Sequence, residues 1–319
     1  MANGGTLDVG RLRLLREIGL RGTIAGAARS LGLTASAVSQ QLAQLEREAG
    51  TPLVDRSPRG VALTGAGRAL AERAGEVLDV LAAARADLDR MSGTLGGPVR
   101  VAAVASAAVT FVSAAVRSLG AAHAGLDVAV TAAEPAAALE RLLAGDADVA
   151  VVDEYDYVPL ALPEFVDARE LRADRLVVTV PVGWTGPRRP TLRHLADADW
   201  VMPPDDAACG LAVRTACRAA GFEPRVRWTS DDMLVLARAV AAGHGVAVLP
   251  LLSVADEVAG VEVRPLREPR LERRLTAVVR SSVAGRPTVR AVLDALARAA
   301  AGTDESDIRA RAGRTIGQR

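Results

Sequence analysis

The stretch TIAGAARSLGLTASAVSQQLAQLEREAGTPLVDRSPRGVALT, residues 23–64, predicts two short helices, a glycine turn and a two-stranded wing. Thr23 and Thr34 each stand before an apolar stripe at helical spacing, so each is expected to cap a helix N-terminus. Gly32 and Gly50 follow these stripes, and glycine readily ends a helix in the left-handed conformation. Two helices that meet over so short a turn form a helix-turn-helix.

The second helix of this stretch has two unlike faces. Val38, Leu42 and Leu45 recur at a spacing that places them on one face, which is expected to be buried. The opposite face is small and polar, which suits a helix that enters the DNA major groove and pairs with base edges. Simple solvation of that face is the alternative. The residues predicted to contact DNA from this helix and its cap are Thr34, Ser36, Ser39, Gln40 and Gln44.

The wing adds basic residues beside this helix. Residues 53–54 and 61–63 are expected to pair as its two strands. Arg56 and Arg59 are predicted to contact phosphates, and Arg59 has the minor groove as an alternative. Thr64 is expected both to donate to a phosphate and to cap the helix that follows.

A helix before the motif is expected to brace it, in the manner of a three-helix winged domain. Asp8 can cap this helix, whose predicted core positions are Leu12, Leu15 and Ile18. Leu14 and Leu20 are expected to be partly exposed or to lie at a subunit contact.

Residues 65–92 carry a heptad seam for about three repeats, which predicts a helix roughly 42 Å long. A lone helix of that length with one apolar stripe needs a partner, and a second copy is the simplest one. The residues predicted to form this dimer contact are Leu70, Val77, Leu81 and Leu88. GAGRAL, residues 65–70, mimics a dinucleotide-binding fingerprint. No parallel strand precedes it, so no cofactor is expected.

The remainder alternates strands and helices after a hinge-like segment, SGTLGGP, at 92–98. Strands expected at 99–104, 126–131 and 148–152 alternate with helices, a pattern typical of a parallel sheet covered by helices. A second such unit follows, with one strand expected at 176–180. The expected domains are a DNA-binding domain at 1–64, a linker helix and hinge at 65–97, an effector-binding domain at 98–301 and a disordered tail at 302–319. Within the third, subdomain I is expected at about 98–163 and 267–301, and subdomain II at about 164–266.

Ligands in open α/β sheets sit at the carboxyl ends of strands. The residues that this rule selects are Ser106, Glu134, Asp153, Pro204, Asp205 and Ser230, and all of them except Pro204 are predicted to contact the effector. Each has an alternative role as a loop or capping residue. Asp231 and Asp232 are expected to cap the next helix.

Composition and spacing argue against catalysis and metal binding. His123, His194 and His244 have no metal-ligand spacing, and no nucleophile elbow or Walker loop occurs. Cys209 and Cys217 are expected to be buried thiols on one helix. Residues 1–64 hold eight Arg against five acids, a local excess of +3 within a chain of net charge +1. No apolar run reaches membrane-spanning length and no signal peptide is evident, so a cytoplasmic protein is expected.

The motifs AARSLGLTASAVSQQLAQLE, LVDR and RGVALTGAG together resemble the N-terminal domain of the LysR-type transcriptional regulators. The match runs without a gap from about Leu12 to Leu70. Leu15 and Val54 stand where the family usually has Phe, which shrinks the core. Gln40 stands where many members carry Arg, which implies a different operator preference.

The segments ARAVAAGHGVAVLP, residues 237–250, and GDADVAVVDE, residues 145–154, resemble the effector-binding domain of the same family. The resemblance implies a type 2 periplasmic-binding-protein-like fold, with a small-molecule effector in a cleft between two α/β subdomains. It also implies binding to double-stranded promoter DNA as a homodimer or homotetramer. The alternative is a small-metabolite-binding protein or enzyme whose N-terminal domain serves association only. Steep salt dependence of DNA binding would favour the first reading.

Overall fold

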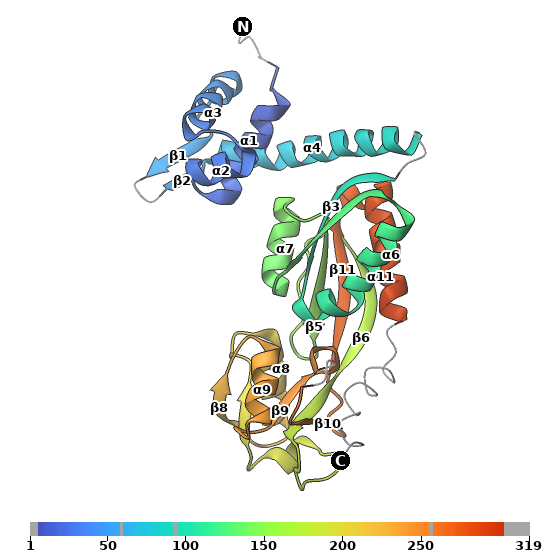
Figure 1. Ribbon diagram of the computed structural model, residues 1–319. Coiled ribbons are helices and arrows are strands. Elements are labelled where there is room, and N and C mark those ends of the chain that lie inside the picture. The colour runs from blue at the N-terminus through green and yellow to red at the C-terminus, as the bar shows by residue number, and fades with distance from the viewer. Residues whose placement is uncertain (1–5, 58–59, 92–94, 255–257, 303–319) are drawn as a thin grey trace. The chain divides into compact units, whose positions relative to one another are not determined.

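Figure 1 shows the computed structural model of the chain, which describes residues 6–57, 60–91, 95–254 and 258–302. The chain forms two compact units, one built mainly by residues up to Leu95 and the other mainly by residues from Gly96 onward. The tail expected to be disordered lies outside the described residues from position 303.

The first unit is a helix-turn-helix domain with a wing and a long helix. Its elements are α1 (Val9–Arg21), α2 (Ile24–Leu31), α3 (Ala35–Ala49), β1 (Val54–Ser57), β2 (Gly60–Leu63) and α4 (Gly65–Met91). The side chains of Asp8, Thr23 and Thr34 accept hydrogen bonds from backbone N–H groups in the first turns of α1, α2 and α3. These caps confirm the predicted helix starts. Gly32 and Gly50 end α2 and α3 with φ of 65° and 69°, in the left-handed region that glycine tolerates.

The core of this unit lies between the three short helices and the first turns of α4. Val38, Leu42 and Leu45 are fully buried there, as the pattern on α3 predicts. Leu14 is only 1% exposed, so the expectation that it lies at the surface is wrong. It is buried because α2, α3, α4 and β2 all contact α1 and so cover more than one of its faces. Leu20 is 38% exposed, as expected.

A close backbone contact docks α4 against the wing. Thr64 Oγ1 donates to the carbonyl of Pro52 at 2.9 Å and accepts from Gly67 N at 3.0 Å. Thr64 N donates to the carbonyl of Leu53, also at 3.0 Å. A Cβ on Gly67 would lie 1.9 Å from that carbonyl oxygen, so only glycine allows the approach.

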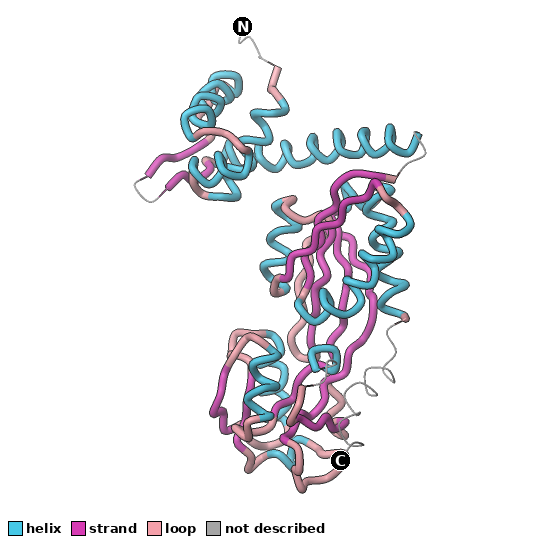
Figure 2. The backbone as a smooth tube through the Cα atoms, viewed as in Figure 1, coloured by secondary structure: helices cyan, strands magenta, loops and turns pink. Residues whose placement is uncertain are grey.

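The second unit is built on a seven-stranded mixed sheet, which runs through both of its halves in Figure 2. The strand order is β10-β6-β11-β5-β3-β4, and β9 also pairs with β6. The strands are β3 (Gly96–Ala103), β4 (Gly125–Ala132), β5 (Val149–Tyr155), β6 (Val166–Pro181), β9 (Ala247–Pro250), β10 (Val261–Pro265) and β11 (Glu272–Arg280). A separate parallel pair joins β7 (Asp199–Met202) to β8 (Arg225–Thr229).

Helices cover both faces of the sheet because the strand order reverses after β4. Strands β4 and β5 both pair in parallel with β3, one on each side. Right-handed crossovers then place α6 (Ser113–Ala122) and α7 (Pro135–Ala144) on opposite faces, as Figure 1 shows. The carboxyl ends of β3 and β5 meet at this reversal, which is where open sheets bind ligands.

Strand β6 is the main link between the two halves of this unit. Its first part pairs with β11 as far as Arg175, and its last part pairs with β9 and β10. The expected strand began only at Leu176, so ten residues of β6 were missed. Of the hinge expected at 92–98, residues 96–98 belong to β3 instead, and residues 92–94 lie outside the described part of the chain.

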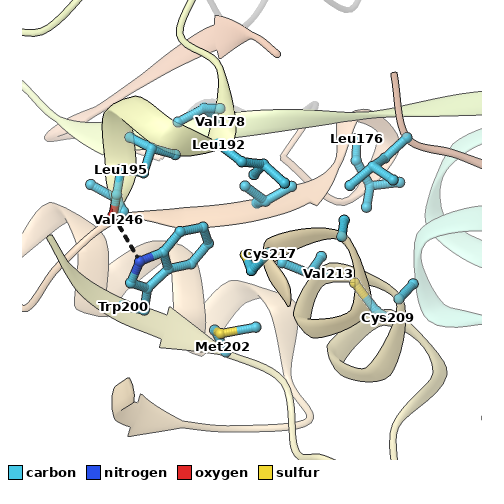
Figure 3. Close-up of a cluster of buried hydrophobic side chains, with 14 of the residues drawn as sticks. Leu176, Val178, Leu192, Leu195, Trp200, Met202, Cys209, Val213, Cys217 and Val246 are labelled. Carbon is cyan, nitrogen blue, oxygen red and sulfur yellow. Dashed lines mark hydrogen bonds between the residues drawn. The ribbon is translucent and has the colours of Figure 1, made fainter. Parts of the chain in front are cut away.

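The core of the second half surrounds Trp200, which is fully buried in the close-up of Figure 3. Its indole Nε1 donates to the carbonyl of Leu195 at 3.0 Å, so the ring's polar atom is satisfied. Helix α8 (Ala208–Ala219) contributes both cysteines to this cluster. Their predicted burial on one helix is confirmed.

One helical stretch, Ala105–Ala122, is long and apolar enough to cross a membrane by length and composition alone. It is not a continuous apolar run, since it includes Arg117 and several Ser and Thr residues. A third of the stretch is buried inside the folded unit, where its C-terminal part contacts β4. It contains α5 (Ala105–Ala107), a π-helical turn (Ala108–Val112) and α6.

We predict that Gly67→Ala destabilises the first unit by at least about 2 kcal/mol, because the added methyl group meets the backbone carbonyl of Leu53, which accepts a hydrogen bond from Thr64 N. The control is Gly75→Ala on the same helix, where a Cβ has nothing within 4 Å. That change should stabilise α4 by about 0.5–1 kcal/mol, since alanine is the better helix former. Thermal unfolding of the full-length variants, followed by circular dichroism, measures both. Equal midpoints for the two variants would contradict the steric argument.

Candidate functional site

The predicted DNA-contact residues of α3 differ in exposure. Thr34, Ser36 and Gln40 are exposed, whereas Ser39 and Gln44 are half-buried. The hydroxyl of Thr34 accepts from Ala37 N at 3.2 Å, so it caps the helix in this structure. Burial of the apolar face therefore directs Ser36 and Gln40 away from the domain core.

Gln44 belongs to a polar network that crosses from α3 to α1. Its Nε2 donates to Glu48 Oε1 at 2.8 Å, and its Oε1 accepts from Arg47 Nη2 at 2.5 Å. Glu48 is paired in turn with Arg11 of α1, with 2.9 Å between Arg11 Nη2 and Glu48 Oε1. Sequence patterning did not reveal this network, because it depends on how α1 crosses α3.

The wing is only partly described. Strands β1 and β2 pair as an antiparallel ribbon, with Val54 opposite Leu63. The side chain of Arg56 and all of Arg59 lie outside the described part, so their phosphate contacts stay predictions. Thr64 caps α4 as expected. Its only hydroxyl hydrogen is directed to Pro52, and a phosphate would have to compete for it.

The heptad seam of α4 divides into two parts. Leu70 is half-buried and, with the fully buried Ala74, packs on the core of its own domain. Val77, Leu81 and Leu88 are 40%, 49% and 60% exposed. Three of the four predicted dimerisation residues therefore form an apolar stripe open to solvent.

The carboxyl ends of the central strands of the second unit converge on one arginine. Arg273, on β11, is 3% exposed and lies between two buried aspartates. Its Nη1 is 2.7 Å from Asp153 Oδ2, and its Nη2 is 2.8 Å from Asp174 Oδ2. Nη2 also donates to Ser106 Oγ at 2.7 Å, and Nη1 to the Tyr155 hydroxyl at 3.3 Å. With its Nε donating to Asp174 at 2.9 Å, the guanidinium makes five donor contacts.

Burial and charge in this Arg273 cluster shift several pKa values. Burial raises the pKa of the Asp174 carboxyl, and Arg273 partly opposes the rise. Burial lowers the pKa of Arg273, but Tyr155, Asp174 and Asp153 together raise it above its usual value. Desolvation raises the pKa of Glu134, and the charges of Asp153 and Asp231 raise it further. The cluster holds two carboxylates, Asp153 and Asp174, against one guanidinium.

The structure brings together only part of the predicted effector set. Ser106 and Asp153 share the guanidinium of Arg273, and Glu134 interacts electrostatically with Asp153. Asp205 is exposed and pairs with Arg214 at 2.5 Å. Ser230 Oγ accepts from Asp232 N at 3.1 Å, and Asp232 itself caps α9 (Met233–Ala241). The capping role expected for the aspartate pair is confirmed for Asp232.

Arg273 is the functional candidate that sequence reasoning missed. Positions 273, 275 and 277 share one face of β11, and Leu275 and Ala277 are buried with Arg273. A charged residue in register with apolar residues of a strand was therefore the available signal. Arg274, one residue later, points outward and is exposed.

The two thiols have no activated character. Burial raises the pKa of Cys209 and that of Cys217 to about 12, so both are protonated at neutral pH. Among the described residues, no group of three or more His, Cys, Asp and Glu side chains could hold a metal ion.

A hollow of about 380 Å³ lies elsewhere on the second unit, between β8 and α9. Trp228 and His244 stack along it with ring centroids 5.0 Å apart. Its lining residues are Trp228, Leu234, Val235, Arg238, Ala239, Ala242 and His244. The five predicted effector residues, all within the described chain, are not part of this lining.

A winged helix-turn-helix domain, a long helix and an α/β unit with a polar cluster at its strand ends define a ligand-responsive transcription factor. Residues 9–68 match the family described as bacterial regulatory helix-turn-helix protein, lysR family. Residues 92–301 match the LysR substrate binding domain. The chain belongs to the LysR family and is a DNA-binding transcriptional regulator with an effector-binding domain.

Individual relatives agree with this assignment. The probable HTH-type transcriptional regulator LrrA of Synechococcus elongatus is 27% identical over 92% of this chain and 98% of its own. A full-length OxyR from Pseudomonas aeruginosa has a similar fold, with a TM-score of 0.69 at 21% identity, over 93% of this chain and 95% of that one. CbnR complexed with its target DNA gives a TM-score of 0.55 at 21% identity, over 92% and 99% of the chains.

We predict that Arg273→Gln lowers the free energy of unfolding of the second unit by about 3–5 kcal/mol, because it leaves two buried carboxylates uncompensated. The matched control, Arg274→Gln, removes an exposed pair with Glu154 and should cost at most about 1 kcal/mol. Urea unfolding followed by tryptophan fluorescence measures both changes. A loss for Arg273→Gln no greater than that of the control would contradict the role of the cluster.

The loss in Arg273→Gln should also depend on pH. Since burial raises the pKa of Asp174, the folded protein holds that proton to higher pH than the unfolded chain does. Stability from this group is therefore present at low pH and is lost as the pH rises through the folded pKa. Without Arg273 to oppose the rise, the pKa of Asp174 should rise further in the variant, which should recover part of its stability as the pH is lowered.

Proposed function

We propose that this regulator reads its operator through the exposed polar face of α3 and responds to a small molecule bound beside the Arg273 cluster. The observation that supports this most directly is the meeting of Ser106 and Asp153, near the carboxyl ends of the parallel strands β3 and β5, with Arg273 on the antiparallel strand β11. The domain bounds expected from the sequence, 1–64, 65–97 and 98–301, remain part of this proposal.

In this proposal Ser36, Ser39 and Gln40 contact base edges. Ser36 and Gln40 are exposed on the face of α3 opposite its buried residues, which supports that role. Gln40 is exposed at the helix surface, and its amide can pair bidentately with adenine. Thr34, Arg56, Arg59 and Thr64 are assigned to the phosphate backbone, where contacts fix position but read no sequence.

We assign the effector to a site beside Ser106, Glu134 and Asp153. Asp174 accepts from the backbone N–H of Leu252, at 3.2 Å, and also holds Arg273. One end of the network therefore lies at Ser106, in subdomain I, and the other at Leu252, in subdomain II. The Ser106 hydroxyl accepts from Arg273 and can still donate to a ligand, so a ligand bound there shares this oxygen with the network that joins the subdomains.

We assign self-association to α4 because this helix exposes a stripe of apolar side chains. Val77, Leu81 and Leu88 repeat at heptad spacing, and a second copy in register would cover them. Two copies of α3 would then reach two half-sites on DNA. A tetramer built from two kinds of dimer contact remains the expectation from family resemblance.

The protein is proposed to act in the cytoplasm, where it meets DNA, and to lack enzymatic activity. Its relatives are named as transcriptional regulators, and both of its thiols are held in the unreactive protonated form. Turnover of a small substrate, together with DNA binding that ignores salt, would favour the alternative of a metabolite-binding enzyme.

We predict that Gln40→Ala weakens binding to the specific operator by about 1–3 kcal/mol and leaves binding to random DNA almost unchanged. Loss of a bidentate base contact weakens discrimination between base sequences. It removes no charge, so the attraction to phosphates that acts on any duplex is unchanged. Footprinting on the upstream region of the gene locates the site, and anisotropy titrations give the affinities. Equal losses on both duplexes would show that Gln40 reads no base.

We predict that Ser106→Ala abolishes the response of operator binding to effector while ligand-free operator affinity is retained, because the hydroxyl lies in the effector-binding unit. Titrations with pools of small metabolites measure the response. Ser118→Ala is the control, since Ser118 bonds the carbonyl of Ala115 within α6. A full response in Ser106→Ala would remove this residue from the site.

A further inference from the structure

Arg47 extends the polar face of α3 toward the C-terminal end of the helix. It lies seven residues after Gln40, so the two side chains project within roughly 20° of each other and about 10 Å apart along the axis. Both are exposed, and Ala43 and Gln44, both half-buried, flank the line between them. The face that carries Gln40 therefore continues to an exposed cation almost two turns further along.

The Arg47 side chain is anchored rather than free. Its Nη2 donates to Gln44 Oε1 at 2.5 Å, and Gln44 Nε2 donates to Glu48 Oε1 at 2.8 Å. Arg11 of α1 holds Glu48 through two contacts, at 2.9 and 3.1 Å. The relay thus runs from α1 to the guanidinium of Arg47. An arginine fixed in this way loses less conformational freedom when it meets a ligand.

We propose that Arg47 contacts a DNA phosphate at the edge of the major groove, and that Gln44 is a positioning residue that holds Arg47 there rather than a reader of bases. This inference rests on the proposed docking of α3 in the groove. The C-terminal end of a recognition helix leaves the groove floor and meets the backbone. A guanidinium matches phosphate geometry.

The hydrogen bonds that Gln44 makes support its role as a positioning residue. Bidentate pairing with adenine needs both an amide donor and an amide acceptor. In Gln44 the acceptor is used by Arg47 and a donor is used by Glu48. Base reading would disrupt this relay, whereas a phosphate contact by Arg47 leaves it intact.

A purely structural role makes a different prediction. Arg47 lies in the last turn of α3, where a cation also interacts favourably with the helix dipole. That role would make the domain less stable when Arg47 is replaced. It would not change how DNA affinity depends on salt.

The test is a titration of the full-length protein with two labelled duplexes of equal length, one from the upstream region of its gene and one of random sequence. Affinities are measured over roughly 50–200 mM salt. Arg47→Gln should reduce the slope of log affinity against log salt by about 0.9 for each bound copy of α3. Both duplexes should weaken by the same factor, roughly eightfold per copy near 0.1 M salt. Arg47→Lys keeps the charge and should restore the slope.

Gln44→Ala keeps the charge of Arg47 but releases its side chain. Both duplexes should weaken equally, by roughly two- to tenfold, with the slope largely retained. The control is Arg169→Gln in the effector-binding unit, which removes the same charge from an exposed pair with Asp294. Its slope should equal that of the unmodified protein. Thermal unfolding of every variant identifies losses that come from stability alone.

Two results would overturn the proposal. An unchanged salt slope in Arg47→Gln rejects the phosphate contact, whatever happens to stability. Weakening of only the upstream duplex by Gln44→Ala rejects the positioning role, because Gln44 would then read a base. DNA binding by the unmodified protein that does not depend on salt would also reject the proposed docking of α3. The salt slope of the unmodified protein therefore tests the docking, and the slope of Arg47→Gln tests the phosphate contact alone.

Discussion

The effector-binding unit depends on one buried guanidinium. Arg273 satisfies Asp153 on β5 and Asp174 on β6, and its own strand, β11, runs between them. Two carboxylates at this depth would otherwise carry a large desolvation penalty. The strands that cross between the subdomains are therefore held by charge as well as by the sheet, and Ser106 is attached to the same point.

The N-terminal domain was predictable because its signals are local. Each cap, such as Thr23 or Thr34, lies within three residues of the backbone group that it satisfies. The burial of Leu14 could not be read this way, since it depends on which faces of α1 other helices cover. Similarly, the stripe on α4 was visible in the sequence. Only the structure shows that Leu70 and Ala74 pack on their own domain whereas Leu81 is left open.

The effector-binding unit was predicted less completely because its signals are non-local. Six of the ten residues at 166–175 are charged and most of the ten are exposed, so no apolar face marks them as a strand. Pairing with β11 makes them one, and that pairing joins residues about 100 positions apart. The strand-end rule found Ser106 and Asp153. It could not find Arg273, because this residue lies near the start of the antiparallel strand β11 and not at the carboxyl end of a strand.

The two cysteines give subdomain II an internal chemical reporter. Both thiols lie in the cluster around Trp200, at 3% exposure for Cys209 and 0% for Cys217. Alkylating reagents need an accessible thiolate, and the folded core supplies neither access nor charge. The rate at which the native protein is alkylated therefore measures how often this subdomain opens, separately from any motion of the DNA-binding domain.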